Sequence, residues 1–307
     1  MTGDLGLWSV LIAVIGGAIR VSTPFLFVSL GETITERSGR INLGLEGTLV
    51  FGAMSAYGTA VLTGSSWAGV AVAGAAGGVL GLVHGAICRL TRVNDVAVGI
   101  ALMLFGSGLA FFLGKPFIQP SAPPLPAIPF GLWSDVPQIQ AALRVNVLFL
   151  IGAGLAAFLW WAFRNTKAGL IVRVVGDSAD AARAMGYDVD RIRLYATAAG
   201  GVLAGIGGAY LSLYYPGSWN EGVSSGQGLM AVALVIFARW NPLACFGAAL
   251  LFGGAGALGP ALQSVGVTQG YYLFYAAPYV LTLALLIATS SSDRALAGAP
   301  GELSLSK

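Results

Sequence analysis

The chain has 307 residues, of which 56% are hydrophobic and only 9% are charged, whereas a typical soluble domain carries about 25% charged residues. So little charge cannot cover the surface of a water-soluble domain, and the high hydrophobicity excludes a disordered chain. The net charge is +3 and the basic residues are dispersed, so there is no sign of nucleic-acid binding. Two cysteines inside apolar stretches and a single histidine suggest neither a disulfide nor a metal site.

Nine apolar segments are long enough to cross a bilayer, which takes about 20 residues. The first is longer than the apolar part of a signal peptide and lacks a basic segment before it, so we expect a retained span. The seventh is the weakest, because only residues 229–238 are continuously apolar, and a broken or half-inserted helix is possible there. The chain is therefore predicted to be an all-α, polytopic membrane helical bundle. The segments are residues 5–31, 41–63, 66–89, 94–114, 145–165, 194–215, 222–240, 242–260 and 271–289.

The distribution of basic residues predicts the orientation, because cytoplasmic loops collect Lys and Arg. If residues 164–193 are cytoplasmic, thirteen of the sixteen Lys and Arg residues lie on that side. The N-terminus is then outside and the C-terminus inside. The transmembrane region is expected over residues 1–290, followed by a cytoplasmic tail over 291–307. Spans one to four and six to nine have opposite orientations, the parity of an inverted-repeat transporter, although no convincing internal sequence repeat is visible.

Two loops are unusual. The external loop, about residues 115–143, contains seven prolines, which block helix and favour extended or turn structure. It is either a solvated connector or a landing surface for an external partner. In the cytoplasmic loop, about residues 164–193, the stretch from Asp177 to Asp180 resembles a capping box with Asp at both ends. The next residues favour helix, and Gly186 suits the left-handed position that ends one. We therefore expect a short, rigid helix between Gly176 and Gly186 that faces a cytoplasmic partner.

Ionisable and polar side chains at membrane depth are costly, so each is a candidate for function. Arg20 and Glu46 are either polar contacts between helices or the lining of a pathway. Their levels along the predicted helices differ by about 9 Å, which makes a direct ion pair uncertain. Asn94 and Asp95 open the fourth span, where a helix cap is the simpler interpretation. Near the seventh span, aromatic residues form either an interfacial belt or an entrance that stacks on a ring-bearing solute. The candidate pathway residues are Arg20, Asn42, Glu46, Asn94, Asp95, Trp219 and Gln227.

Several patterns argue against other chemistry. Glycines at four-residue spacing, such as Gly77 and Gly81, predict close helix packing in the membrane. The GxGxxG stretch at residues 254–259 lies inside an apolar span, so it does not indicate nucleotide binding, and no P-loop motif is present. No metal site, cofactor or catalytic set is predicted in this chain. A self-sufficient secondary transporter or channel remains an alternative, and an intramembrane enzyme is the weakest one.

Three stretches carry a family resemblance. Residues 36–47 contain the pattern ERSGxxNxGLEG, residues 169–186 read GLIVRVVGDSADAARAMG, and residues 228–242 read GLMAVALVIFARWNP. Together these resemble the permease subunits of bacterial ABC importers for nucleosides. Those permeases belong to a branch that also serves simple sugars and branched-chain amino acids. Ala238 is a departure, because the family often has Gly at that position.

The resemblance implies one half of a membrane pore with the type II, vitamin-importer-like architecture, in a bacterial plasma (inner) membrane. It implies a second, homologous permease, a cytoplasmic ABC ATPase that binds the ATP and Mg, and an extracytoplasmic substrate-binding lipoprotein, with lipid around the bundle. A purine nucleoside is the favoured solute, and a simple sugar or branched-chain amino acid is the alternative. The second stretch would be the segment that couples to the ATPase, through Gly176, Asp177, Asp180, Ala181, Ala182, Arg183, Met185 and Gly186.

Overall fold

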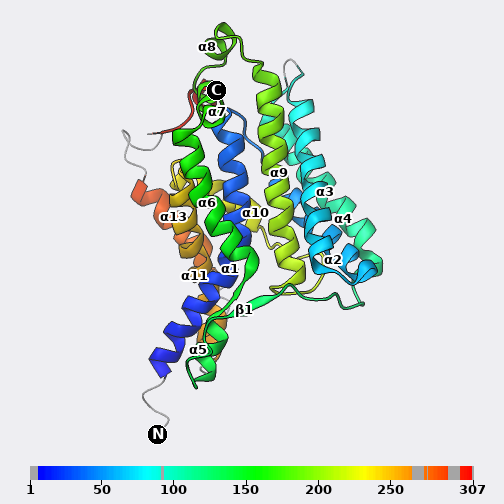
Figure 1. Ribbon diagram of the computed structural model, residues 1–307, viewed down its shortest axis with the longest axis vertical. Helices are drawn as coiled ribbons and strands as arrows, with labels where there is room; N and C mark the ends of the chain where they lie inside the picture. Colours follow the sequence, from blue (N-terminus) through cyan, green and yellow to red (C-terminus); the bar gives the residue numbers. More distant parts are fainter. Residues whose placement is uncertain (1–5, 91–92, 265–272, 275, 290–297, 306–307) are drawn as a thin grey trace.

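The computed structural model describes residues 6–90, 93–264, 273–274, 276–289 and 298–305. It is an elongated helical bundle, with the start of α1 at one end and α8 at the other (Figure 1). We call these ends the hairpin end, after the small β1–β2 hairpin near it, and the α8 end. The helices are α1 (Gly6–Arg37), α2 (Leu45–Thr63), α3 (Ser66–Ile87), α4 (Asp95–Gly114), α5 (Pro137–Ala142), α6 (Val147–Asn165), α7 (Lys167–Asp177), α8 (Ala179–Ala184), α9 (Val189–Leu213), α10 (Gln227–Phe237), α11 (Pro242–Ser264), α13 (Ala277–Thr289) and α14 (Gly301–Leu305).

Seven helices in the described part of the chain are long and apolar enough to cross a membrane. They account for the expected spans one to six and eight. The weak seventh segment contains a helix of only 11 residues, α10, which is too short to cross a bilayer and fits the expectation of a broken or half-inserted helix. The ninth expected segment contains α13, of 13 residues, and its first residues, 271–272, lie outside the described part of the chain.

The first helix is longer than expected: α1 continues to Arg37, whereas the sequence predicted an end near residue 31. The chain then turns back into the bundle. The Asn42 amide donates to the Glu32 carboxylate at 2.8 Å, and Glu32 lies more than one turn before the end of α1. Consequently α2 begins at Leu45 inside the bundle, not at its surface, and most of this helix is buried. Helices that start within the membrane are typical of transporters.

The predicted glycine packing is confirmed between α3 and α9. A Cβ added to Gly77 would clash with the carbonyl oxygen of Gly201, and one added to Gly81 would clash with that of Thr197. The two backbones therefore lie in direct contact, as small residues permit in a membrane bundle. Helix α9 also packs on α1 and α2, so it is the centre of this half of the bundle.

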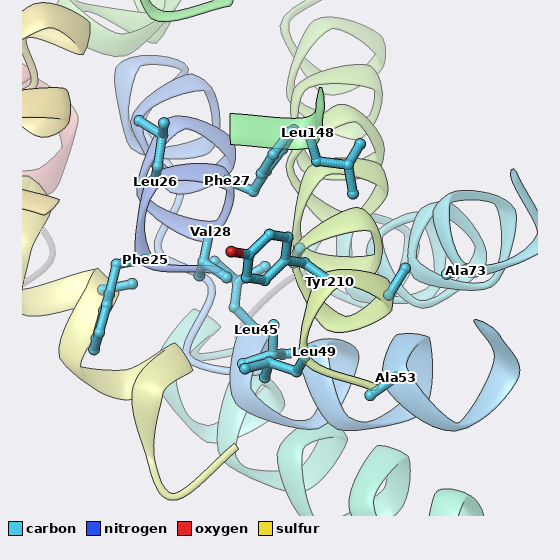
Figure 2. Close-up of a cluster of buried hydrophobic side chains, with 14 of the residues drawn as sticks. Phe25, Leu26, Phe27, Val28, Leu45, Leu49, Ala53, Ala73, Leu148 and Tyr210 are labelled. Carbon is cyan, nitrogen blue, oxygen red and sulfur yellow. The ribbon is translucent and has the colours of Figure 1, made fainter. Parts of the chain in front are cut away.

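The apolar core lies where α1, α2 and α9 meet (Figure 2). Tyr210 of α9 points between Phe27 and Val28 of α1 and Leu45 and Leu49 of α2. All of these side chains are at most 1% exposed. Such packing fixes the position of the α2 N-terminus, which carries Glu46.

The proline-rich loop has more structure than expected. Strand β1 (Ala127–Pro129) pairs antiparallel with β2 (Arg144–Asn146), and a helix of six residues, α5, lies between them. Helix was expected to be blocked here, but α5 begins at Pro137, and proline is tolerated in the first turn of a helix, where no backbone donor is needed. Leu132 and Trp133 remain highly exposed at 77% and 75%.

Candidate functional site

The three resembling stretches, far apart in sequence, converge at the α8 end around the last turn of α1. The Glu36 carboxylate accepts a hydrogen bond from the Trp240 indole, and Arg37 Nε donates to the Trp240 carbonyl at 3.0 Å. Gly176, at the end of α7, lies so close that a Cβ would clash with the carbonyl oxygen of Arg37. Trp240 follows α10 with a φ of 54°, a strained backbone for a bulky residue. Strain of this kind persists only where the surrounding contacts over-determine it.

Next to this junction, α7 packs on the bundle and leads into α8, which projects beyond the ends of the other helices (Figure 1). The short helix expected between Gly176 and Gly186 is present as α8, and Gly186 has the expected left-handed φ of 85°. Its N-cap differs from expectation: Ser178 accepts from the Ala181 amide at 3.2 Å, while Asp177 ends α7. Serine is an equally good cap. Asp180 instead pairs with Arg183 at 3.1 Å on the exposed face of α8.

A link that the sequence did not suggest holds α8 to the bundle. Glu302 of α14 accepts from the Ala179 amide at 2.8 Å and from Arg193 at 3.0 Å. Arg193 Nε donates in turn to the Ser38 carbonyl at 3.0 Å. Partial burial acts to raise the pKa of Glu302, but these hydrogen bonds and the charge of Arg193 outweigh it and lower the pKa. The tail therefore joins α8, α9 and the turn after α1.

Asn94 and Asp95 lie at the same end of the bundle. Asn94 caps α4 by accepting from the Val96 and Ala97 amides, as expected. Asp95 forms an ion pair with Arg40 at 2.6 Å, and Arg40 also donates to the Cys88 carbonyl. These contacts tie the starts of α2 and α4 to the end of α3.

Glu46 lies inside the bundle and does not pair with Arg20. Its carboxylate accepts from the Ser224 hydroxyl at 2.6 Å, the Gly226 amide at 3.2 Å and the Gly228 amide at 2.6 Å. It therefore occupies the N-terminus of the half-helix α10, where the helix dipole and free amides favour an anion. Gln227 lies beside it, and its side-chain oxygen is buried with no hydrogen-bond partner in the described part of the chain.

Arg20 faces the hairpin end. It lines a cavity of about 540 Å³ together with Arg144, Tyr214 and Tyr215. Arg20 and Glu46 therefore do not meet, because Arg20 lines this cavity beside Arg144 whereas Glu46 contacts the start of α10. The difference in level along the predicted helices had already made a direct ion pair uncertain. Trp219 is buried and donates to the Gly114 carbonyl at 3.0 Å, so it packs on the end of α4 rather than in an exposed aromatic belt.

Sequence reasoning missed Glu32, Glu36, Ser224 and Glu302. The first two were set outside the first span because its end was placed too early, and as buried acidic residues they would otherwise have been candidates. The sequence Ser224-Ser225-Gly226 before an apolar run is a helix-start signal that points to Ser224. Nothing in the local sequence marks Glu302. In the described part of the chain, no group of three or more His, Cys, Asp or Glu residues is placed to hold a metal ion.

Comparison with known proteins agrees with this geometry. A family model described as "Branched-chain amino acid transport system / permease component" matches residues 14–290. The putative glucose ABC transporter permease protein TsgC13 of Haloferax volcanii is 33% identical over 258 residues, 82% of this chain and 78% of the relative. The guanosine permease NupQ of Bacillus subtilis is 27% identical, covering 90% and 92% of the two chains. The nucleoside permease NupC of Lactococcus lactis is 28% identical, covering 89% and 90%.

The matched region contains α1 from residue 14 onward, all the other long helices, the short helix α10 and the junction of the three stretches. Permease subunits of this kind are not themselves enzymes. The chain therefore belongs to the family of branched-chain amino acid transport system permease components, as a multi-pass membrane subunit of an ABC transporter.

Proposed function

We propose that this chain is one half of the translocation pore of an ATP-driven importer for a nucleoside, with the type II architecture and an inverted repeat, and that a separate ATPase drives it. The observation that carries the proposal is the junction at the α8 end. There Arg37, Trp240 and Gly176 bring α1, the α10–α11 turn and α7 into direct contact. A displacement of α8 by a bound ATPase would move all three elements, because closely packed contacts transmit displacement.

In this proposal α8 is the coupling helix. Gly176, Asp177, Asp180, Ala181, Ala182, Arg183, Met185 and Gly186 form or flank it. Met185 is 56% exposed, and the Asp180–Arg183 pair lies on the open surface. Ala182 instead packs inward with Val175 and Val189. A small helix with one face anchored and the other exposed suits docking into a cleft of an ATPase.

The translocation path would pass the interior helix ends. Glu46, Asn42 and Gln227 lie where α2 and α10 begin inside the bundle. Discontinuous helices place backbone polar groups at membrane depth where a solute can reach them. Asn94 and Asp95 are part of the cytoplasmic frame, and Arg20 belongs to the external end of the same path.

The same proposal assigns the orientation and partners. The α8 end carries Arg164, Arg173 and Arg183 and would be cytoplasmic. The hairpin end would then face a substrate-binding lipoprotein, and the exposed Leu132 and Trp133 would be the surface that contacts this lipoprotein.

A second, different permease would complete the pore. Bacillus subtilis has two guanosine permeases related to this chain, NupQ and a second one, NupP.

The solute is proposed as a purine nucleoside because three relatives are named for guanosine or nucleosides. A sugar is the second candidate, because the relative of 33% identity is named as a putative glucose permease. The candidate substrate-binding protein, titrated with guanosine, adenosine and glucose by calorimetry, would separate the two. Nucleoside binding supports the first choice, and glucose binding alone contradicts it.

Transport itself is tested by reconstituting this chain with its partner permease and ATPase in proteoliposomes. Uptake of the solute that the substrate-binding protein binds is expected to require ATP on the side of the vesicle membrane where the ATPase lies. Vanadate is expected to abolish this uptake. Uptake driven by an ion gradient without ATP would contradict the proposal and favour a secondary transporter.

A further inference from the structure

The α8 end holds a second feature that the transport proposal does not use. A cavity of about 440 Å³ lies between the end of α1, the end of α6, α7 and the α10–α11 turn. Four arginines from these four elements line it: Arg37, Arg164, Arg173 and Arg239. No acidic residue is among the described residues that line it.

The four arginines carry the same charge, and their neighbours in the described part of the chain use only some of their hydrogen-bond donors. Each guanidinium has five N–H donors. Arg37 uses Nε on the Trp240 carbonyl, and Arg164 stacks on the Trp160 ring at 4.6 Å. Arg173 has a buried Nε without a hydrogen-bond partner in the described part of the chain. Arg173 and Arg164 both act electrostatically on Arg37, and the carboxylate of Asp177 partly offsets them from outside the cavity lining.

Four like charges in one cavity repel each other, and an anion among them would offset this repulsion. Planar guanidinium groups match the oxygens of a phosphate, which they bind through paired hydrogen bonds. The cavity also opens beside a membrane-facing helix. Phe158 and Trp161 of α6 are 56% and 49% exposed, and Trp marks the level of the headgroups.

We infer that this cavity is a binding site for a phosphate-bearing anion, with an anionic phospholipid headgroup as the source that the position of α6 favours. Basic pockets between membrane helices on the positively charged side bind such headgroups. The inference does not depend on the proposed transport function, because it concerns binding to the permease alone. A bound lipid would join α7 to α1 and to the Arg239 turn, and so would stiffen the base of the α8 segment.

The test uses the purified full chain in neutral detergent, titrated with phosphatidylglycerol and monitored by native mass spectrometry. Phosphatidylcholine is the neutral lipid control. Arg173→Gln and Arg239→Gln are each expected to weaken phosphatidylglycerol binding about fivefold. Arg173→Lys and Arg239→Lys keep the charge but lose the paired hydrogen bonds, so they are expected to weaken binding less than the Gln variants. Lys167→Gln removes the same charge from α7 outside the cavity and is expected to leave binding unchanged. Size-exclusion profiles show that each variant is folded.

A second arm replaces the lipid with glycerol 3-phosphate, which has the headgroup phosphate without acyl chains. Binding of the lipid alone identifies the membrane as the source, and equal binding of both identifies a free phosphate compound. Either result supports a phosphate site. The inference is overturned if phosphatidylglycerol binds no more tightly than phosphatidylcholine, or if Lys167→Gln weakens binding as much as the cavity variants.

Discussion

The carboxylate of Glu46, at the start of α2, accepts a hydrogen bond of 2.6 Å from the amide of Gly228 in the first turn of α10. Two helices that begin inside the bundle are thereby joined through one side chain. A Cβ on Gly228 would lie 2.6 Å from the Glu46 carboxylate oxygen and from its Cα, so only glycine permits this approach. The contact connects the first and third resembling stretches in the interior of the bundle, apart from their junction at the α8 end.

Glu46→Ala should destabilise the start of α10. The variant leaves the Ser224 hydroxyl and the Gly226 and Gly228 amides without their acceptor, and each buried donor left unpaired costs about 1–3 kcal/mol. Hydrogen exchange measured by mass spectrometry should become faster in residues 224–230. Glu221→Ala, at an exposed position of the same segment, serves as the control. Unchanged exchange in Glu46→Ala would show that the contact does not hold α10.

Gly186→Val should uncouple ATP hydrolysis from uptake. Gly186 has a φ of 85°, and nothing lies within 4 Å of an added Cβ, so the substitution acts through the backbone and not through a clash. A left-handed conformation costs a residue other than glycine about 1–2 kcal/mol, which shifts the end of α8. We expect more ATP hydrolysed per solute transported in proteoliposomes. Gly186→Asn, which tolerates this conformation, should retain coupling, and normal coupling in Gly186→Val would contradict the docking role of α8.

Gly81→Ala should lower the thermal stability of the purified chain. The added methyl group meets the Thr197 carbonyl oxygen where α3 touches α9, and overpacking of this kind costs about 1–3 kcal/mol. Gly108→Ala on α4 is the matched control, because nothing lies within 4 Å of its added Cβ. It should be neutral or slightly stabilising, since alanine favours helix by about 1 kcal/mol. Equal melting temperatures for the two variants would contradict direct backbone contact between α3 and α9.

The link through Glu302 should weaken in acid. Because hydrogen bonds lower the pKa of Glu302 below its usual 4.5, the ionised carboxylate stabilises the folded state above that value. The contribution is expected to disappear as the pH falls below 4.5 through the lowered pKa. A spin-label distance between α8 and the turn after α1 should therefore broaden at low pH in the wild type. In Glu302→Gln the distribution should be broad at neutral pH as well. A pH response that persists in this variant would assign the effect to another group.

The sequence by itself determined the membrane bundle, the close packing of the glycine-spaced helices, the shortness of α10, and the short helix that Gly186 ends. Each follows from a local rule: hydropathy over about 20 residues, four-residue glycine spacing, or the backbone preference of one residue. The family resemblance also came from short contiguous stretches, and the match over residues 14–290 confirms it.

Only the tertiary structure decided which polar residues meet. Residues 38–44 turn back into the bundle, so Glu46 reaches α10 and not Arg20. The depth of Glu46 therefore cannot be estimated by counting residues along a straight helix. Glu302 is distant in sequence from Arg193 and Ala179, and its local sequence contains no sign of either contact. The four arginines of the basic cavity come from four separate elements. Contacts between remote segments depend on how the chain packs as a whole, and a local pattern cannot encode them.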